Sequence, residues 1–392
     1  MKITYLINGL YTGGAEAMLY KMLCQIDRTQ FEPSVISMMD RGTWGDKIEA
    51  LGVPVYTLDL TQGSSPLQAL QKLRQVMRST QPDLIHGNMY HANLLSQMAK
   101  RFAGGHVPVI WEIHHTLTAL SSEKRTTQFL IRLGTKLAHQ CDRIVYVSHR
   151  SRAQHEQLGY PSNKAITIPN GCDITQFTRQ SNAHNVLCQS LGIPTESLLI
   201  GSMARFHEMK DHHNLLEAAA IAVPHFPNLH FALVGRDVTP ENPQLQDWIR
   251  ALNLGDRVHL LGERSDVVHL MSAFDLFTSS SAFGEAFPNV LVEAMACGTP
   301  CVTTDVGDCE LIVGETGRTV PPKDAHALGN AWRALLSLPV ADRVQLGQRA
   351  RDRVVENFSM EIVMGHYETL YHTIVAETQQ RQTKKSLFAA TF

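Results

Sequence analysis

Residues 283–300 read FGEAFPNVLVEAMACGTP and carry a clear strand–turn–helix–strand pattern. A short apolar strand, Leu276–Thr278, precedes the loop that opens this segment. Pro288 suits the first turn of a helix, and Gly298 suits the position just past a helix end. The apolar stretch Pro300–Thr303 then forms the next expected strand. A strand, a helix and a second strand in this order predict a parallel βαβ unit.

Short apolar strands and helical segments alternate along the rest of the chain. Ile3–Ile7 and Val109–Ile113 are expected strands in the first half, and Leu198–Met203 is one in the second. Domains usually hold ~100–200 residues, so a chain of 392 residues is expected to form two. The pattern therefore predicts an α/β protein with two Rossmann-like, doubly wound parallel-sheet domains. A central cleft that both domains face is the expected ligand site.

The domain boundaries follow from where this alternation pauses. The stretch Thr178–Asn185 is polar and lacks periodicity, which is typical of a linker. We therefore expect an N-terminal domain over residues 1–178 and a C-terminal domain over residues 179–358. Residues 359–378 have the periodicity of a closing helix, and residues 379–392 are expected to be a frayed tail.

Composition excludes several classes of protein. Lys and Arg number 35 against 37 Asp and Glu, so a broad basic surface for nucleic acid is not expected. No apolar run reaches the ~18–20 residues that span a bilayer, and the first apolar run is too short for a secretory signal. The seven cysteines contain no CxxC pair, which argues against a zinc site or a disulfide framework. These features favour a cytoplasmic protein.

Segment 283–300 also carries the chemistry. The start of its helix would present amide groups to an anion such as a diphosphate. Glu285 precedes that helix and Glu293 lies about one turn inside it. Carboxylates are poor phosphate ligands but good acceptors for sugar hydroxyls, so a nucleotide sugar would satisfy both features. Alternatively, Glu285 caps the helix and Glu293 is a solvated helix residue.

The pattern of two glutamates separated by seven residues closely resembles glycosyltransferase family 4. Members of this family are retaining enzymes of the GT-B fold that use nucleotide sugars. The resemblance extends over most of the chain. Its further matching pieces are Gly13-Gly14-Ala15-Glu16, Ile113-His114, Pro169-Asn170-Gly171-Cys172-Asp173, Arg205 to Lys210, Val234-Gly235, Leu261-Gly262 and Asp305-Val306-Gly307. The fold that the resemblance implies has a C-terminal helix, here residues 359–378, that crosses back to the N-terminal domain.

The resemblance assigns the donor site to the C-terminal half. It implies that Glu285 contacts the transferred sugar and that Glu293 contacts the ribose. The other donor-binding residues that it implies are Gly235, Arg264, Ala286, Phe287, Pro288, Asn289 and Val290.

Arg205 and Lys210 follow the expected strand Leu198–Met203. Two cations just past a strand end can clamp a diphosphate, although either could equally be a surface charge. The resemblance implies that both contact the donor diphosphate and stabilise the leaving group. Ala204 stands where the family often has glycine.

The N-terminal half contributes a glycine turn and a histidine pair. Gly13 and Gly14 either form an ordinary strand-to-helix turn or, as the resemblance implies, approach the donor phosphates. Glu16 serves the helix N-terminus or positions the acceptor. His114 ends an expected strand, where a histidine can be merely structural, and the resemblance places it on the donor sugar. His115 is the alternative if the strand register slips by one residue.

The resemblance implies a retaining glycosyltransferase. It would transfer a sugar from a UDP- or GDP-sugar to a hydroxyl of a glycan or lipid-linked acceptor, in cell-surface polysaccharide synthesis. The N-terminal half would bind the acceptor. No Asp-x-Asp triplet is present, so no metal or other cofactor is expected beyond the nucleotide sugar as co-substrate. The alternatives are a nucleotide-sugar 2-epimerase and a nucleotide-sugar-binding protein without catalysis.

A basic edge raises the question of membrane contact. Arg125, Arg132 and Lys136 flank the apolar residues Phe129 to Ile131. Such an edge can place a protein at the inner face of a membrane, near a lipid-linked acceptor. The alternative is an ordinary half-buried helix.

Overall fold

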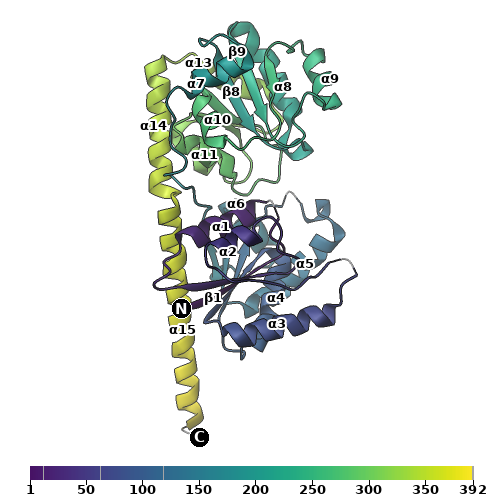
Figure 1. The fold of residues 1–392 in the computed structure, drawn as a ribbon, viewed down its shortest axis with the longest axis vertical. Coiled ribbons are helices and arrows are strands. Elements are labelled where there is room, and N and C mark those ends of the chain that lie inside the picture. The colour runs from purple at the N-terminus through teal and green to yellow at the C-terminus, as the bar shows by residue number, and fades with distance from the viewer. Residues whose placement is uncertain (12, 62, 118, 391–392) are drawn as a thin grey trace. The chain divides into compact units, whose positions relative to one another are not determined.

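The structure, a computed structural model, describes residues 1–11, 13–61, 63–117 and 119–390, with side chains described up to residue 384 (Figure 1). The chain divides into two compact units. Unit 1 comprises Met1–Gly171 and Met360–Phe392, and unit 2 comprises Cys172–Ser359. The division therefore falls before the expected boundary at residue 178. The reason is a long-range contact, since the Phe177 carbonyl accepts a hydrogen bond from Arg351 in unit 2 at 2.8 Å.

Within its described residues, unit 1 holds a seven-stranded parallel sheet in the order β3-β2-β1-β4-β5-β6-β7. The strands are β1 (Lys2–Ile7), β2 (Glu32–Ser37), β3 (Val55–Thr57), β4 (Leu84–Asn88), β5 (Val109–Ile113), β6 (Arg143–Tyr146) and β7 (Ala165–Thr167). Most of their positions are buried, because helices cover both faces of a parallel sheet.

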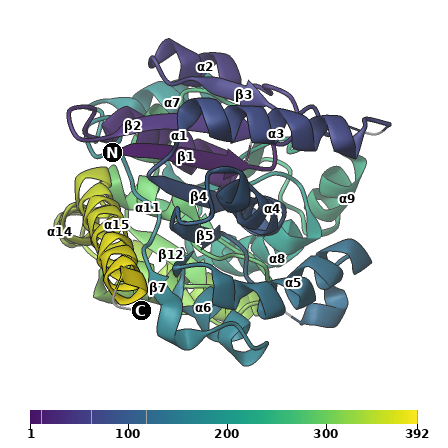
Figure 2. The same cartoon turned by 90° about the horizontal axis from the view of Figure 1, so that it is seen from below.

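The helices of unit 1 lie on both faces of this sheet (Figure 2). They are α1 (Gly14–Gln25), α2 (Gly45–Ala50), α3 (Pro66–Thr80), α4 (Met89–Phe102), α5 (Arg125–Leu137), α6 (His149–Gln157) and α15 (Met360–Ala390), with short 3₁₀ turns at Leu120–Ser122, Ala138–Gln140 and Ser162–Lys164. One apolar core includes side chains of α1 and α15, and a second includes side chains of α3, α4 and α5. The doubly wound arrangement predicted from the sequence is thus confirmed for this half.

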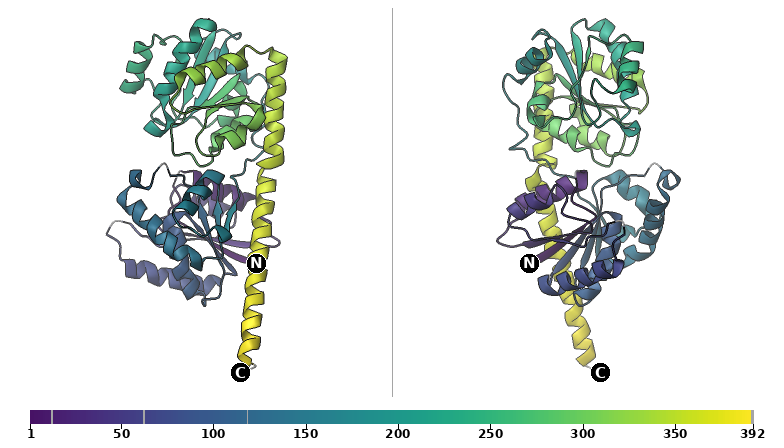
Figure 3. Two further views of the ribbon diagram at one scale, coloured as in Figure 1. Left: turned by 180° about the vertical axis from the view of Figure 1, so that it is seen from behind. Right: turned by 45° about the vertical axis from the view of Figure 1, so that its right-hand side comes forward.

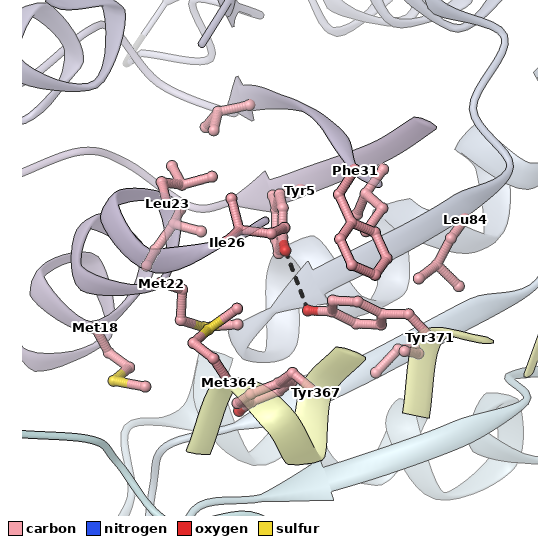
Figure 4. Close-up of a cluster of buried hydrophobic side chains, with 14 of the residues drawn as sticks. Tyr5, Met18, Met22, Leu23, Ile26, Phe31, Leu84, Met364, Tyr367 and Tyr371 are labelled. Atoms are coloured by element: carbon pink, nitrogen blue, oxygen red, sulfur yellow. Dashed lines mark hydrogen bonds between the residues drawn. The ribbon is translucent and has the colours of Figure 1, made fainter. Parts of the chain in front are cut away.

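Helix α15 belongs to unit 1 although it follows unit 2 in the chain. Its buried residues recur every three or four positions and form one apolar face: Met360, Val363, Met364, Tyr367, Leu370, Tyr371 and Ile374. The Tyr371 hydroxyl also meets the Tyr5 hydroxyl of β1 at 3.1 Å (Figure 4). Residues 379–390, expected as a frayed tail, continue this helix, and residues 391–392 lie outside the described residues.

Unit 2 holds a six-stranded parallel sheet over its described residues, in the order β10-β9-β8-β11-β12-β13. The strands are β8 (Leu198–Met203), β9 (Leu229–Val234), β10 (Val258–Leu260), β11 (Leu276–Ser279), β12 (Cys301–Thr304) and β13 (Arg318–Val320). In both units the first strand lies inside the sheet with later strands on either side. This order confirms the Rossmann-like prediction.

Helices surround the sheet of unit 2 as well (Figure 3). They are α7 (Ala183–Leu191), α8 (His212–Ala222), α9 (Pro243–Ala251), α10 (Val267–Ala273), α11 (Asn289–Ala296), α12 (Cys309–Val313), α13 (Ala325–Leu336) and α14 (Val340–Asn357), with 3₁₀ turns at Glu208–Lys210, Val223–His225 and Gly314–Thr316. Helices α8, α9 and α13 share one core with the sheet. The expected linker Thr178–Asn185 contains the start of α7, so it is not wholly irregular.

The strand order fixes where a ligand can bind in each unit. In open parallel sheets, ligands bind at the carboxyl ends of the two strands between which the winding direction reverses. These strands are β1 and β4 in unit 1, and β8 and β11 in unit 2. The loops after β8 and β11 contain the expected residues Arg205, Lys210 and Glu285.

Candidate functional site

Lys210 and Glu285 form an ion pair at the carboxyl edge of the unit 2 sheet. Nζ of Lys210 contacts Oε1 of Glu285, and the same oxygen accepts a hydrogen bond from the Ser281 hydroxyl at 2.7 Å. The side chains of Lys210 and Glu285 are 17% and 10% exposed. The structure thus brings together a cation and a carboxylate that lie 75 residues apart in sequence.

Glycines let the loops of this edge approach one another closely. Gly307 has a φ of 59°, and a Cβ atom there would lie 2.3 Å from the carbonyl oxygen of Glu285. Gly235 has a φ of 149°, and its Cβ would lie 2.1 Å from the carbonyl oxygen of Ala204. Both positions therefore require glycine. Gly235, an expected donor-binding residue, holds the loop that begins with Arg205 against the end of β9.

The start of α11 lies directly after Glu285 in the chain. Pro288 is its N-cap residue, and among the described residues no side chain caps this helix start. Ala286 and Phe287 are buried, which fixes the backbone that leads into the helix. Asn289, Val290 and Glu293 are partly buried. The expected donor-binding segment is therefore a rigid loop that ends at a helix N-terminus, the kind of site that attracts anions.

The two expected arginines of unit 2 differ in their contacts. Arg205 is exposed, and in the described part of the chain its guanidinium makes no hydrogen bond or ion pair. Arg264 is engaged by Asp266 through two hydrogen bonds of 2.8 and 2.6 Å. The hydrogen bond from Arg264 lowers the pKa of the Asp266 carboxyl. Arg205 is thus available to an anion, whereas Arg264 already has a carboxylate partner.

In unit 1, the expected glycine turn leads from β1 into α1. Gly13 is the N-cap residue with extended backbone, and a Cβ on Gly13 would lie 2.3 Å from Oε2 of Glu16. A Cβ on Gly14 would meet no atom within 4 Å. Burial raises the pKa of the Glu16 carboxyl, and the nearby His114 opposes that shift. Glu16 therefore folds back on the helix start, and Thr12 lies outside the described residues.

The two neighbouring histidines face different partners. Nε2 of His114 lies 3.2 Å from Oε1 of Glu112, and the His114 side chain is only 7% exposed. Nε2 of His115 lies 3.0 Å from Oε1 of Glu123, and its side chain is 30% exposed. The His115 ring also meets the Tyr90 ring edge-on. The two histidines therefore differ in their partners: His114 contacts the buried carboxylate of Glu112, and His115 contacts the more exposed Glu123.

The sequence analysis did not single out Glu112. Its side chain is 1% exposed and lies among the apolar residues of β5. Burial alone would raise the pKa of its carboxyl, but the imidazoles of His114 and His86 outweigh burial and hold that pKa well below its usual range. A glutamate inside an otherwise apolar strand was the signal that could have identified it.

No group of three or more His, Cys, Asp or Glu side chains among the described residues is arranged to hold a metal ion. Within the same residues, no helix combines the length and apolar character needed to cross a membrane.

Comparison with protein families places each half of the chain in a known group. The family described as "Glycosyltransferase Family 4" matches residues 12–176, and that described as "Glycosyl transferases group 1" matches residues 186–353. The first match covers most of unit 1, and the second covers most of unit 2 with the ion pair.

Individual proteins match over most of their length. The N-acetyl-alpha-D-glucosaminyl L-malate synthase of Bacillus anthracis is 28% identical over 79% of this chain and 80% of its own. A UDP-Gal:alpha-D-GlcNAc-diphosphoundecaprenol alpha-1,3-galactosyltransferase of Escherichia coli is 22% identical over 84% of this chain and 85% of its own. Crystal structures of Anabaena HepE in complex with UDP and with UDP-glucose superpose with TM-scores of 0.83 and 0.78, each at 25% identity. They cover 95% and 97% of this chain and all of HepE.

Proposed function

Because the chain belongs to glycosyltransferase family 4, whose members are retaining enzymes of the GT-B fold, we propose the following reaction. A hexosyl group passes from a UDP-sugar to a hydroxyl of a glycan or lipid-linked acceptor, in cell-surface polysaccharide synthesis. The observation that carries this proposal is the ion pair between Lys210 and Glu285. It lies where the winding of the unit 2 sheet reverses and directly before the start of α11.

Three features of unit 2 support a nucleoside diphosphate in this site. Arg205 is exposed, Lys210 lies in the same loop after β8 and pairs with Glu285, and α11 begins shortly after Glu285 in the chain. Together they offset the negative charge that builds on the diphosphate as it leaves. The UDP and UDP-glucose complexes of HepE favour UDP over GDP as the nucleotide. Unit 2 is accordingly the proposed donor domain, and unit 1 the proposed acceptor domain.

The two glutamates take separate parts of the donor. Glu285 has one oxygen bound by Lys210 and Ser281, which holds its carboxylate for the hydroxyls of the transferred sugar. Glu293 lies about one turn into α11 and is assigned to the ribose. His114 of unit 1 is assigned to the transferred sugar. Gly13 and Gly14 are assigned to the donor phosphates.

The reaction needs no carboxylate nucleophile. The bond between the anomeric carbon and the diphosphate oxygen breaks, and the acceptor oxygen bonds to the same face of that carbon. The acceptor proton passes to the departing phosphate, so charge and atoms balance. Retention of configuration follows from this same-face route.

Transfer is expected without a metal ion, because cations and a helix start already face the proposed diphosphate. The rate should persist in excess EDTA. Complete loss of transfer on chelation, restored by one divalent ion, would contradict this proposal.

The basic edge of α5 is the proposed contact with a membrane. Phe129 is 64% exposed, and Arg125, Arg132 and Lys136 are exposed on the same helix. Cosedimentation with vesicles that contain anionic lipid should fall when Arg132 and Lys136 are changed to Glu. Unchanged binding to such vesicles would remove this edge from the proposal.

The test of the function separates it from its alternatives. The protein is incubated with UDP-glucose, UDP-galactose, UDP-N-acetylglucosamine and the GDP-sugars, and the products are identified. Release of UDP with transfer or slow hydrolysis is expected for one donor, and Glu285→Gln should lower its rate by about tenfold or more. Formation of the 2-epimer would indicate an epimerase. Tight binding with no product would indicate a protein without catalysis.

A further inference from the structure

The buried carboxylate of Glu112 lies at the centre of a polar cluster inside unit 1. Its Oε2 lies 3.0 Å from Nε2 of His86, and its Oε1 accepts a hydrogen bond from the Tyr367 hydroxyl at 2.5 Å. The same Oε1 lies 3.2 Å from Nε2 of His114. One hydroxyl from α15 therefore donates a hydrogen bond to this carboxylate, and two imidazoles, from β4 and from the end of β5, approach it at ion-pair distance. His86 and Tyr367 are 0% exposed.

The proton positions in this cluster can be assigned by requiring every donor to face an acceptor. Nε2 of His86 faces Oε2 of Glu112 at ion-pair distance without an aligned hydrogen bond, so a neutral His86 with its proton on Nε2 accepts at Nδ1, where the Tyr371 hydroxyl lies at 3.0 Å. Tyr371 then donates to His86 and accepts from the Tyr5 hydroxyl, at 3.1 Å. Burial raises the pKa of the Tyr371 and Tyr367 hydroxyls well above the usual range, so both stay protonated and can donate.

The requirement that every donor faces an acceptor also sets the position of the ring proton of His114. Glu112 is an acceptor only, so it orients Nε2 of His114 as the N–H that faces it. Both ring nitrogens of His114 are buried without an aligned hydrogen bond among the described residues, and Nε2 keeps its 3.2 Å ion-pair contact with Glu112. A buried ring nitrogen without a protein partner loses free energy unless a ligand supplies one. The cluster thus fixes the ring by one nitrogen and leaves the other for a ligand.

We propose that Glu112 is a positioning residue for His114, and that α15 holds Glu112 in place through the Tyr367 hydroxyl. The helix that follows unit 2 in the chain would in this way set the orientation and proton position of a residue at the sugar site. This inference rests on the proposed function through the role assigned to His114.

Packing of α15 against the sheet does not by itself explain the polar cluster at Glu112. Apolar side chains such as Met364 and Leu370 already pack α15 against the sheet. A charged carboxylate inside that core costs free energy unless it is paired. Its donors include the one histidine that the resemblance assigns to the reaction. Packing alone would be served equally well by an apolar residue at position 112.

Kinetics of matched variants provide the first test. Glu112→Gln leaves one acceptor oxygen for the tyrosine hydroxyl and the two imidazoles, and Tyr367→Phe removes that hydroxyl. We expect kcat to fall at least ~10-fold in Glu112→Gln and less in Tyr367→Phe, with the donor KM within about twofold. Tyr5→Phe is the control, since it also removes a hydroxyl contact to α15 but one that does not touch Glu112. Equal effects of Tyr367→Phe and Tyr5→Phe, or no effect of Glu112→Gln, would overturn the proposal.

Nitrogen-15 NMR of the histidine rings tests the geometry without turnover. The His114 signals are assigned by their loss in His114→Asn. In the wild type, above the pH at which the ring loses its charge, the proton should reside on Nε2 with Nδ1 bare. A proton on Nδ1 would overturn the inference. If His114→Asn instead keeps full activity while the proton is on Nε2, the assigned role of His114 fails and the positioning by Glu112 stands.

Discussion

Glu112 in unit 1 and Glu285 in unit 2 are buried carboxylates at the carboxyl ends of two similar sheets, yet their surroundings differ. Glu112 lies inside a strand, is 1% exposed and meets two imidazoles and a tyrosine hydroxyl. Glu285 lies in a loop, is 8% exposed and meets a lysine and a serine. The first is enclosed by protein donors, and the second lies at the edge of the sheet where a ligand is proposed to bind. One topology thus provides both the carboxylate proposed as a support and the carboxylate proposed to bind a ligand.

The largest expected effect is the loss of Lys210. Lys210→Ala removes both a diphosphate contact and the cation beside Glu285, so kcat should fall by ~10²-fold or more. The free energy of unfolding should fall by about 2 kcal/mol, less than for a fully buried pair. This loss of unfolding free energy is larger than the loss expected when an isolated surface charge is removed. Activity assays and denaturant titration measure the two quantities.

Two controls sharpen this prediction. Arg205→Ala should lower kcat while leaving the free energy of unfolding unchanged, since Arg205 is exposed. Lys72→Ala removes an exposed ion pair with Asp59 and should change stability by less than ~1 kcal/mol and activity not at all. Full activity of both Lys210→Ala and Arg205→Ala would refute the diphosphate clamp.

The next effect separates the two glutamates of unit 2. Glu285→Gln acts at the transferred sugar and should lower kcat by about tenfold or more. Glu293→Gln weakens acceptance of the ribose hydroxyls and should mainly raise the donor KM. Steady-state kinetics with the preferred UDP-sugar measure both constants. If both variants change only KM, the division of roles is wrong.

The smallest effect concerns stability and pH. The pKa of Glu112 is lowered in the folded protein by His114 and His86. Its ionised form therefore stabilises the fold above the unfolded pKa of ~4.3, and this contribution is lost as pH falls toward the folded pKa. The stability difference between wild type and Glu112→Gln should be largest above pH ~5 and should shrink below ~4. Urea titrations at several pH values measure it, and a difference that grows toward low pH would contradict this sign.

Much of the fold could be predicted from local pattern alone. The strand Leu198–Met203 has the predicted bounds, because an apolar run marks it in the sequence. The helix Asn289–Ala296 begins beside Pro288 and ends before Gly298, as those two residues predicted. The boundary near Gly171 was placed too late, since residues 172–178 are held by long-range contacts that no local pattern reveals. Residues 379–392 were expected to be a frayed tail, yet residues 379–390 continue α15.

The residues of the candidate site could be predicted only where they belong to a recognisable sequence motif. Spacing and resemblance identified Glu285 and Lys210, but not that they pair across 75 residues. The cluster at Glu112 depends on Tyr367, which lies 255 residues away. Contacts of this kind arise from the topology and from the return of α15, so a single sequence does not contain them as a local signal.

The stereochemistry of transfer tests the proposed reaction most directly. UDP-sugars labelled with carbon-13 at the anomeric carbon are followed by NMR from the start of turnover. Retention predicts that the first product, glycoside or released sugar, has the α configuration of the donor. A first product with the β configuration, or a donor converted to its 2-epimer, would contradict the reaction proposed here.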